Sequence, residues 1–486
     1  MKNKLDQKVA PLYQAMKKYI ADEALAFHTP GHKQGKGVVK AFGDMMGKES
    51  LLMDVSLMSE LDDLHDPQTY IKEAQALAAD LYKADSSYFV INGTTCAIQA
   101  MILATLNKGD KILIPRNSHS SVIGGVISAG ADPIYLKPET DEDLGIAMAV
   151  SLSTIEVALK EYPDVKAVLI VNPTYYGVTA DVEKIAELVH SNGKILLVDE
   201  AHGPHLIFSN KLPISAIEAG ADIVAQSTHK ILSALTQSSM LHCRHENIDV
   251  ERLQNILSLL QSTSPNYLLL ASLDLARQQM ATEGKNLLER AITLSNNLRK
   301  EINNIAGLSC FGLEKKDDIA MFGLDYTKIT VCFKELGLTG AEAEKILRYD
   351  YKIQAELADV YNVLFIISIG DDDKSVQILL ESLVDMANKF KEKKRLEFKV
   401  NLPSIPKKVI LPQAAFYAVK NIINFSEAAG SICGEKITFY PPGIPIICPG
   451  EEITQEIIEY CSDLAKKGYK VVGPKDCTLE KIRVVK

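Results

Sequence analysis

Lys230 ends the segment Ser227-Thr228-His229-Lys230, which follows the apolar run DIVAQ. Most lysines are solvated surface charges, but this one has apolar residues on both sides and hydroxyl groups and a histidine beside it. An amine in such surroundings favours formation of a Schiff base with an aldehyde. Ser227 and His229 are close enough along the chain to bind a phosphate on the same ligand.

Asp199 follows a second apolar run, KILLV, within the sequence VDEAHG. A carboxylate at the mouth of a buried strand can pair with a protonated pyridine nitrogen, which keeps that ring cationic and electron-demanding. The same carboxylate could instead bind a metal ion or cap a helix. Asp199 alone does not decide between these roles.

Two further segments also follow apolar runs. Asn92-Gly93-Thr94-Thr95 comes after SYFVI and before a helical pattern, so hydroxyls and free backbone N–H groups at a helix N-terminus could bind phosphate. An ordinary strand-to-helix turn capped by Thr94 or Thr95 has the same pattern. His119, in RNSHSSV, follows KILIP and could stack on a cofactor ring, although a structural histidine is the ordinary alternative.

The order of these motifs is more specific than any one of them. A phosphate turn, a stacking histidine, an aspartate and a lysine follow one another along the chain. Together they predict a site for pyridoxal 5'-phosphate (PLP), with Lys230 as the Schiff-base residue. No metal site is predicted.

The elements that carry these residues read as an open α/β sheet. Short runs rich in Val, Ile and Leu alternate with amphipathic stretches, which is typical of parallel strands joined by helices. In such sheets ligands bind beyond the carboxyl ends of the strands. We expect strands at 87–91, 111–114, 167–171, 194–199 and 222–227, and helices at 71–83, 96–106 and 181–191.

Composition restricts the class of protein. The chain has 486 residues, with 53 Lys+Arg against 62 Asp+Glu and a net charge of −9, which predicts neither a nucleic acid nor an anionic membrane as partner. The eight cysteines have neither disulfide-framework nor zinc-site spacing. No apolar run reaches the length of a membrane span, and the N-terminal sequence MKNKLDQ has no secretion signal. We therefore expect a cytoplasmic protein.

Motifs along nearly the whole chain resemble those of the Orn/Lys/Arg decarboxylase family, in its short form. The segments are TPGHKQGKG (29–37), ELDDLHDP (60–67), NGTT (92–95), RNSHSSV (116–122), NPTYYGV (172–178), VDEAHGPH (198–205), STHK (227–230), STSPNYLLLASLD (262–274) and YPPGIPIICPGE (440–451).

The resemblance implies an aspartate-aminotransferase-like, fold-type I large domain, a smaller α/β domain and a family-specific C-terminal domain. We place an N-terminal arm at 1–65, the large domain at 66–285, the small domain at 286–395 and the C-terminal domain at 396–486. The Lys-rich run at 389–399 is interpreted as a solvated helix end. The long members of the family have an N-terminal wing that builds decamers. Here TPGH lies near the N-terminus, so we expect a homodimer with shared active sites, or a pair of such dimers.

The resemblance also implies roles for single residues. Lys230 is the Schiff-base lysine, Asp199 pairs with the ring nitrogen, His119 stacks on the ring, Ala201 packs beneath it and His202 lies nearby. Either Lys230 or His202 would return a proton to the substrate. The phosphate is expected to contact Gly93, Thr94, Thr95, Ser227 and His229, with Thr263 or Ser264 added by a neighbouring subunit. Thr94 stands where many relatives have serine, but it keeps the hydroxyl.

The expected reaction is decarboxylation of a basic L-amino acid. Short-form relatives favour arginine, which would give agmatine for polyamine synthesis, with lysine or ornithine as the alternative. Asp62, Asp63 and Glu435 are candidates to bind the distal charge of the substrate, although each could equally cap a helix or pair locally. A fold-type I aminotransferase or aldolase would share Asp199 and Lys230. A non-catalytic homologue would be expected to have lost one of them.

Overall fold

A seven-stranded sheet forms the centre of the computed structural model, which describes residues 5–315, 321–396, 403–440, 445–466 and 469–486. The spatial order is β1-β10-β9-β8-β6-β2-β3. The bounds are Ser86–Val90 (β1), Ser239–Cys243 (β10), Ile223–Gln226 (β9), Ile195–Asp199 (β8), Ala167–Val171 (β6), Lys111–Pro115 (β2) and Asp132–Leu136 (β3). These strands agree with all five that the sequence predicts, to within one or two residues.

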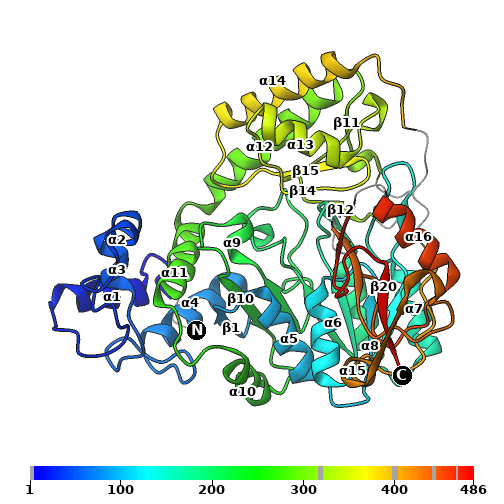
Figure 1. Ribbon diagram of the computed structural model, residues 1–486. Coiled ribbons are helices and arrows are strands. Elements are labelled where there is room, and N and C mark those ends of the chain that lie inside the picture. The colour runs from blue at the N-terminus through cyan, green and yellow to red at the C-terminus, as the bar shows by residue number, and fades with distance from the viewer. Residues whose placement is uncertain (1–4, 316–320, 397–402, 441–444, 467–468) are drawn as a thin grey trace.

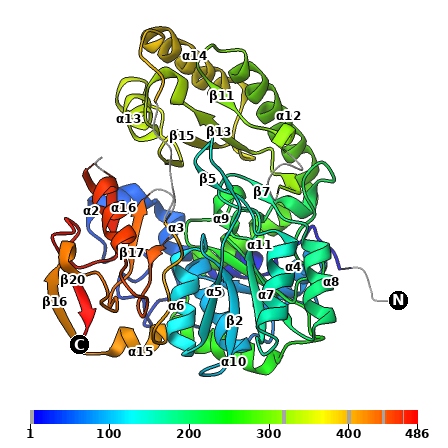
Figure 2. The same ribbon diagram turned by 90° about the vertical axis from the view of Figure 1, so that its right-hand side faces the viewer.

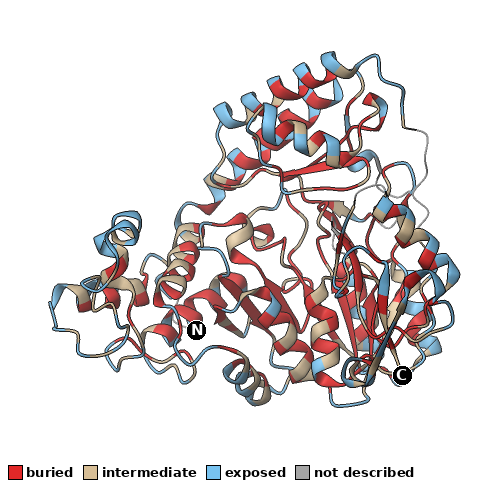
Figure 3. Ribbon diagram, in the orientation of Figure 1, coloured by how far each residue is buried: buried red, intermediate tan, exposed pale blue. Residues whose placement is uncertain are grey.

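Helices cover both faces of this sheet (Figures 1 and 2). One core joins the sheet to α5 (Gly93–Thr105), α6 (Ser120–Ala129) and α10 (Val250–Leu260). A second core on the opposite face includes α7 (Leu152–Glu161) and α8 (Val182–Ser191). Because both faces are covered, the five inner strands are buried along nearly their whole length (Figure 3), whereas the edge strands β1 and β3 are partly half-buried. The expected α/β architecture is therefore confirmed.

Strand β10 is the exception that the sequence pattern did not reveal. Strands β2, β3, β6, β8 and β9 run parallel, whereas β10 pairs antiparallel with both β9 and β1. Its sequence, SMLHC, contains only two large apolar residues and follows the polar run TQSS. The carboxyl ends of β1, β2, β6, β8 and β9 still meet at one edge of the sheet, where the predicted site residues lie.

The N-terminal segment packs onto the large sheet but also projects from it. Helix α1 (Pro11–Ala21) and α4 (Tyr70–Tyr82) share a core with α11 (Tyr267–Thr282). The buried guanidinium of Arg277 donates to the carbonyls of Gln7 and Val9. Helix α2 (Lys40–Met46) and α3 (Lys48–Met53) extend away from the body (Figure 1), and α2 has no buried residue (Figure 3).

A second, smaller sheet lies above the carboxyl edge of the first (Figure 1). Its strands are antiparallel, in the order β11 (Ser309–Cys310), β13 (Lys328–Cys332), β15 (Asn362–Ile366) and β14 (Leu357–Ala358). Three helices accompany it, α12 (Gly284–Asn303), α13 (Gly340–Asp350) and α14 (Asp373–Phe390). The short strand β12 (Gly323–Leu324) connects the two units by pairing with β7 (Val178–Thr179). The expected small α/β unit is present, and it begins with the long helix α12.

The C-terminal segment has its own core. It contains α15 (Pro412–Tyr417), β16 (Lys420–Asn424) paired with β20 (Lys481–Val485), a sheet of β17 (Ile437–Tyr440), β18 (Pro445–Ile447) and β19 (Lys470–Val472), and α16 (Gln455–Lys466). Arg116, after β2, anchors it by a bidentate pair with Glu451 (2.6 and 2.8 Å).

Part of the predicted YPPGIPIICPGE motif, residues 441–444, lies outside the described residues, as do 397–399 of the Lys-rich run. The division into domains at 65, 285 and 395 remains a proposal. No helix within the described ranges is long and apolar enough to cross a membrane.

Candidate active site

A pocket of about 220 Å³ surrounds Lys230 at the carboxyl edge of the large sheet. It contains every predicted cofactor contact except Thr263 and its alternative Ser264. The lining residues are Gly93, Thr94, Thr95, Ile98, His119, Val171, Pro173, Tyr175, Asp199, Ala201, His202, Ser227, His229 and Lys230. The sequence motifs after β1, β2, β8 and β9 therefore meet in space, as their positions at strand ends predict.

Lys230 lies on the short helix α9 (Thr228–Ile231), directly after β9. Its Nζ is 2.9 Å from Nε2 of His202 and 5.6 Å from the centroid of the Tyr175 ring. Burial lowers the pKa of Lys230, and the carboxylates of Asp199 and Glu356 partly oppose that shift. A lowered pKa gives the amine a larger neutral, nucleophilic fraction than a solvated lysine has.

Asp199, the last residue of β8, is only 3% exposed. Burial raises its pKa from 3.8 to about 6, although the Lys230 charge and a hydrogen bond from the Ala201 N–H (3.2 Å) lower it. A cation placed opposite this carboxylate would favour its ionised form. The protonated ring nitrogen of PLP is such a cation, so Asp199 fits the predicted role.

The segment 92–95 leads from β1 directly into α5, where the sequence places the candidate phosphate turn. Gly93 has a φ of 76° and begins α5, whose first backbone N–H groups face the same edge of the sheet as Lys230. The buried Thr94 hydroxyl shares hydrogen bonds with Ser227 (2.5 Å) and Ser239 (2.6 Å). The His229 ring Nδ1 lies 2.9 Å from the Ser238 carbonyl, to which it donates. Since a neutral imidazole has one donor and one acceptor, its Nε2 would donate to a phosphate only in the protonated ring.

The two remaining histidines of the pocket are uncharged at neutral pH. His119 caps α6 by accepting from the Ser121 N–H, and its pKa falls to about 4 because of burial and the charges of Lys230 and Lys436. Burial and Lys230 also place the pKa of His202 well below its usual value. The His202 ring lies 4.6 Å from that of Tyr175. Neutral rings can contact a cofactor ring without adding charge.

The three acids predicted to bind the substrate lie outside this pocket. The Asp62 carboxylate accepts from the backbone N–H groups of Gln68, Thr69 and Ile71, which lowers its pKa despite its burial. Asp63 accepts from the His65 N–H. Glu435 accepts from the Lys475 and Arg483 N–H groups. These contacts favour the alternative that the three acids stabilise local structure.

Thr263 is exposed in the connection between α10 and α11. Its predicted contact requires a second subunit, so it stays a prediction. Conversely, the sequence reasoning gave no role to Tyr175 or Glu356. Tyr175 lies in NPTYYGV, one of the segments that resemble the family, and this position could have indicated a role in the pocket. Glu356 belongs to the small unit, and no local pattern relates it to Lys230.

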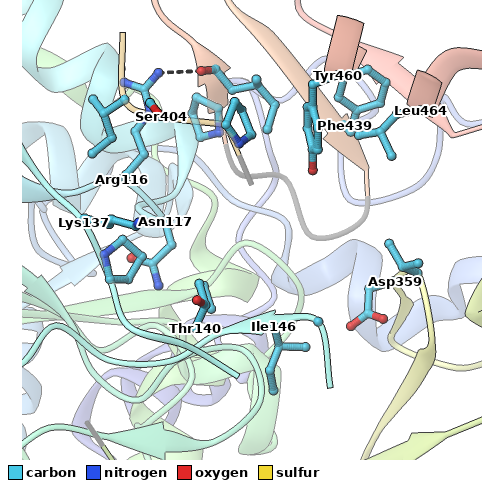
Figure 4. Close-up of a pocket in the computed structure, with 18 of the residues that line it drawn as sticks. Arg116, Asn117, Lys137, Thr140, Ile146, Asp359, Ser404, Phe439, Tyr460 and Leu464 are labelled. Atoms are coloured by element: carbon cyan, nitrogen blue, oxygen red, sulfur yellow. Dashed lines mark hydrogen bonds between the residues drawn. The ribbon is translucent and has the colours of Figure 1, made fainter. Parts of the chain in front are cut away.

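A second cavity, of about 120 Å³, lies beside the C-terminal segment (Figure 4). Mostly apolar residues line it, including Ile146, Phe439 and Leu464. Arg116 borders it and donates to the Ile446 carbonyl (2.7 Å). Neither Lys230 nor Asp199 lines this cavity, so it is distinct from the pocket of the predicted chemistry.

Comparison with solved structures defines the class. The lysine decarboxylase of Francisella novicida superposes with a TM-score of 0.84 at 25% identity, over 99% of this chain and 81% of that one. An alanine–glyoxylate aminotransferase from Nostoc sp. superposes with a TM-score of 0.54 at 20% identity, over 67% of this chain and 88% of that one. The chain thus has the architecture of the fold-type I PLP enzymes.

Sequence comparison narrows the class to a family. Residues 10–375 match the model of the Orn/Lys/Arg decarboxylase major domain, and residues 396–473 match that of its C-terminal domain. The arginine decarboxylase of Bacillus subtilis is 44% identical over 99% of both chains. The inducible lysine decarboxylase of Escherichia coli K12 is 28% identical over 95% of this chain and 78% of its own. This chain belongs to the Orn/Lys/Arg decarboxylase family.

Proposed function

We propose that this chain is a PLP-dependent decarboxylase that converts L-arginine to agmatine and CO2. The observation that carries the proposal is the placement of the Lys230 amine and the buried Asp199 carboxylate in one pocket at the carboxyl edge of the sheet. Relatives of matching length support the substrate, because several at 42–44% identity are arginine decarboxylases. The lysine decarboxylases are more distant.

The described residues fit PLP. Lys230 would bind its aldehyde, Asp199 its ring nitrogen, and the turn at 93–95 with Ser227 and His229 its phosphate. His119 and Ala201 would contact the ring. The hydroxyl cluster of Thr94, Ser227 and Ser239 and the raised pKa of Asp199 suit a ligand with an anionic and a cationic end. When bound, the cofactor supplies an electron-withdrawing ring that accepts the electron pair released with CO2.

The chain's own residues prepare this chemistry. The ionised Asp199 would keep a proton on the ring nitrogen of the bound cofactor. The lowered pKa of Lys230 makes its amine available to bind and to carry a proton. His202 is neutral, so its Nε2 can accept a hydrogen bond from Lys230 Nζ and orient that amine. Of the two candidate proton donors, this arrangement favours Lys230, because the accepting Nε2 of a neutral His202 carries no proton.

Binding of a basic substrate needs a distal counter-charge. Backbone N–H groups already occupy the carboxylates of Asp62 and Glu435. The carboxylate of Glu356, in contrast, is exposed, and its negative charge opposes the lowering of the pKa of both Lys230 and His229. We therefore propose Glu356 ahead of the three acids chosen from sequence.

The test is a panel of L-arginine, L-lysine and L-ornithine, with amine products separated by chromatography. We expect agmatine from arginine at a rate at least about tenfold above those for the other amines. Lys230→Ala should abolish CO2 release and leave the fold intact. Keto acids in place of amines would indicate an aminotransferase. Cadaverine as the main product would assign the lysine alternative.

We also propose a cytoplasmic homodimer, or a pair of such dimers. The projecting N-terminal arm exposes large apolar side chains that a second copy would cover, namely Leu25 (73%), Phe27 (91%), Val39 (73%) and Met45 (71%). Thr263 lies next to this arm, because His65 contacts the Ser262 carbonyl (2.8 Å). Eight free cysteines agree with a reducing compartment.

A further inference from the structure

A fully buried charged cluster lies beneath the Lys230 pocket. Lys328, Asp325 and His205 are each no more than 1% exposed. Asp325 Oδ2 accepts from Lys328 Nζ (2.8 Å) and from His205 Nε2 (3.1 Å). Buried ion pairs contribute little net stability, because desolvation of the charges offsets their attraction. A cluster of this kind therefore calls for a role besides stability.

Every hydrogen-bonding group of the Lys328–Asp325 pair is used. An ammonium has three N–H donors, and Lys328 Nζ has three acceptors: Asp325 Oδ2, the Thr327 hydroxyl (3.2 Å) and the His202 carbonyl (3.4 Å). Asp325 Oδ1 accepts from the N–H (3.0 Å) and the hydroxyl (2.7 Å) of Thr327. The geometry therefore fixes the direction of the third Lys328 N–H, toward His202.

That contact leads directly to the amine of Lys230. The main chain of His202 is anchored by Lys328, and its ring Nε2 lies 2.9 Å from Lys230 Nζ. The other ring nitrogen, Nδ1, is buried and has no partner among the described residues. No hydrogen bond to Nδ1 therefore fixes the imidazole among the described residues, and the Tyr175 ring packs against it with the ring centroids 4.6 Å apart.

The cluster also anchors the loop that carries Tyr175, another residue lining the pocket. The Asp325 N–H donates to the Gly177 carbonyl (2.8 Å), at the end of the loop that carries Tyr175. Gly177 has a φ of 85°, and a Cβ there would lie 2.8 Å from the Asp325 carbonyl and 3.0 Å from Lys328 Cβ. Residues 325–327 themselves connect β12, which pairs with β7, to β13 of the small sheet. The cluster thus lies where the two sheets join.

We propose that Lys328, held in place by Asp325 and His205, is a positioning residue that keeps the His202 imidazole against Lys230. Lys328 does not line the Lys230 pocket, so it would act through the His202 main chain. The catalytic part of this inference rests on the proposed function, but the structural part does not. The lowered pKa of His202, to which burial, Lys230 and Lys328 contribute, agrees with a neutral ring that accepts from the amine.

The variant must remove the anchor without leaving a lone buried charge. Lys328→Met alone would strand Asp325, so its failure to fold would be ambiguous. The double variant Asp325→Leu/Lys328→Met removes both charges and keeps the volume nearly constant. Asp222→Asn is the matched control, because Asp222 is also buried and pairs with a histidine, His190 (2.8 Å), at the opposite end of the sheet.

The readout is the rate at which diethyl pyrocarbonate acylates each histidine of the full-length chain, resolved by peptide mass spectrometry. We expect the His202 rate in the double variant to rise at least about fivefold, with His119 and His229 within about twofold of wild type. Asp222→Asn should leave all three unchanged. An unchanged His202 rate, or an equal rise at all three histidines, would overturn the proposal.

A kinetic readout addresses the catalytic part separately. In the PLP-loaded double variant, kcat should fall about tenfold or more while KM changes less than about threefold, because loss of an orienting contact affects the reacting geometry more than binding. A rise in KM with kcat unchanged would contradict a positioning role for Lys328. If no basic amino acid is decarboxylated by wild type, the proposed function fails, whereas the labelling result still decides whether Lys328 anchors His202.

Discussion

The charge on Asp199 is unfavourable until a cation stands opposite it. Burial raises its pKa from 3.8 to about 6. Between these pH values the folded, cofactor-free chain binds more protons than the unfolded chain, so its stability falls as the pH rises through this window. Above it the full penalty is present, roughly 3 kcal/mol. Binding of PLP would relieve this penalty, which links cofactor affinity to the fold.

Asp199→Asn should therefore separate stability from activity. Without cofactor, the variant should be up to about 3 kcal/mol more stable than wild type at pH 7.5 and nearly equal to it at pH 4, since only the ionised carboxylate is unfavourable. With PLP, decarboxylation should fall more than about 100-fold. Urea unfolding at both pH values and CO2 release are the measurements. A variant less stable than wild type at pH 7.5 would show that Asp199 already has a favourable partner.

At the scale of elements, strand ends made the site predictable. Lys230, Asp199, His119 and Thr94 each follow a buried apolar run, and parallel strands bring such positions to one edge. Strand β10 was missed because its direction depends on pairing with β1 and β9, to which its short sequence gives no clue.

Contacts between distant segments could not be predicted. Lys328 meets the His202 carbonyl across a separation of 126 residues, and the carboxylate of Glu356, in the small unit, opposes the lowering of the Lys230 pKa. For Asp62, the sequence left two roles open. The backbone N–H donors that favour capping become visible only when the turn before α4 is folded.

The turn before α5 provides a test at the same scale. Gly93 has a φ of 76°, and a Cβ there has room, so Gly93→Ala introduces backbone strain without a clash. The strain, about 1–2 kcal/mol, should displace the N–H groups at the start of α5 and raise the PLP concentration for half-saturation about tenfold. Gly109→Ala is the control, with a φ of 85° and equal space outside the pocket. Equal PLP affinity in the two variants would argue against a phosphate site here.

At the scale of the whole molecule, the segment around α2 and α3 has few buried residues (Figure 3). Phe27 is 91% exposed, and Leu25, Val39 and Met45 are further exposed apolar side chains of the N-terminal arm. Side chains of this size are costly to leave in water, at about 1.5–3 kcal/mol each. A second copy that covers them would bring two chains together around the pockets.

Phe27→Asp should weaken that association about tenfold or more, because a charge replaces an aromatic side chain that the second copy would bury. Sedimentation velocity over a range of concentrations measures the change. Tyr417→Asp is the control, since Tyr417 is 75% exposed on α15 of the C-terminal segment. Dissociation caused by Tyr417→Asp, with Phe27→Asp still dimeric, would place the interface on the C-terminal segment instead.

The attachment of PLP to Lys230 tests the whole account most directly. The full-length protein is loaded with PLP, reduced with borohydride, digested and examined by mass spectrometry. A single pyridoxyl group on the peptide that contains Lys230, absent in Lys230→Ala, is the predicted result. Labelling of another lysine, or no labelling above that of the variant, would contradict the assignment of this pocket as the active site.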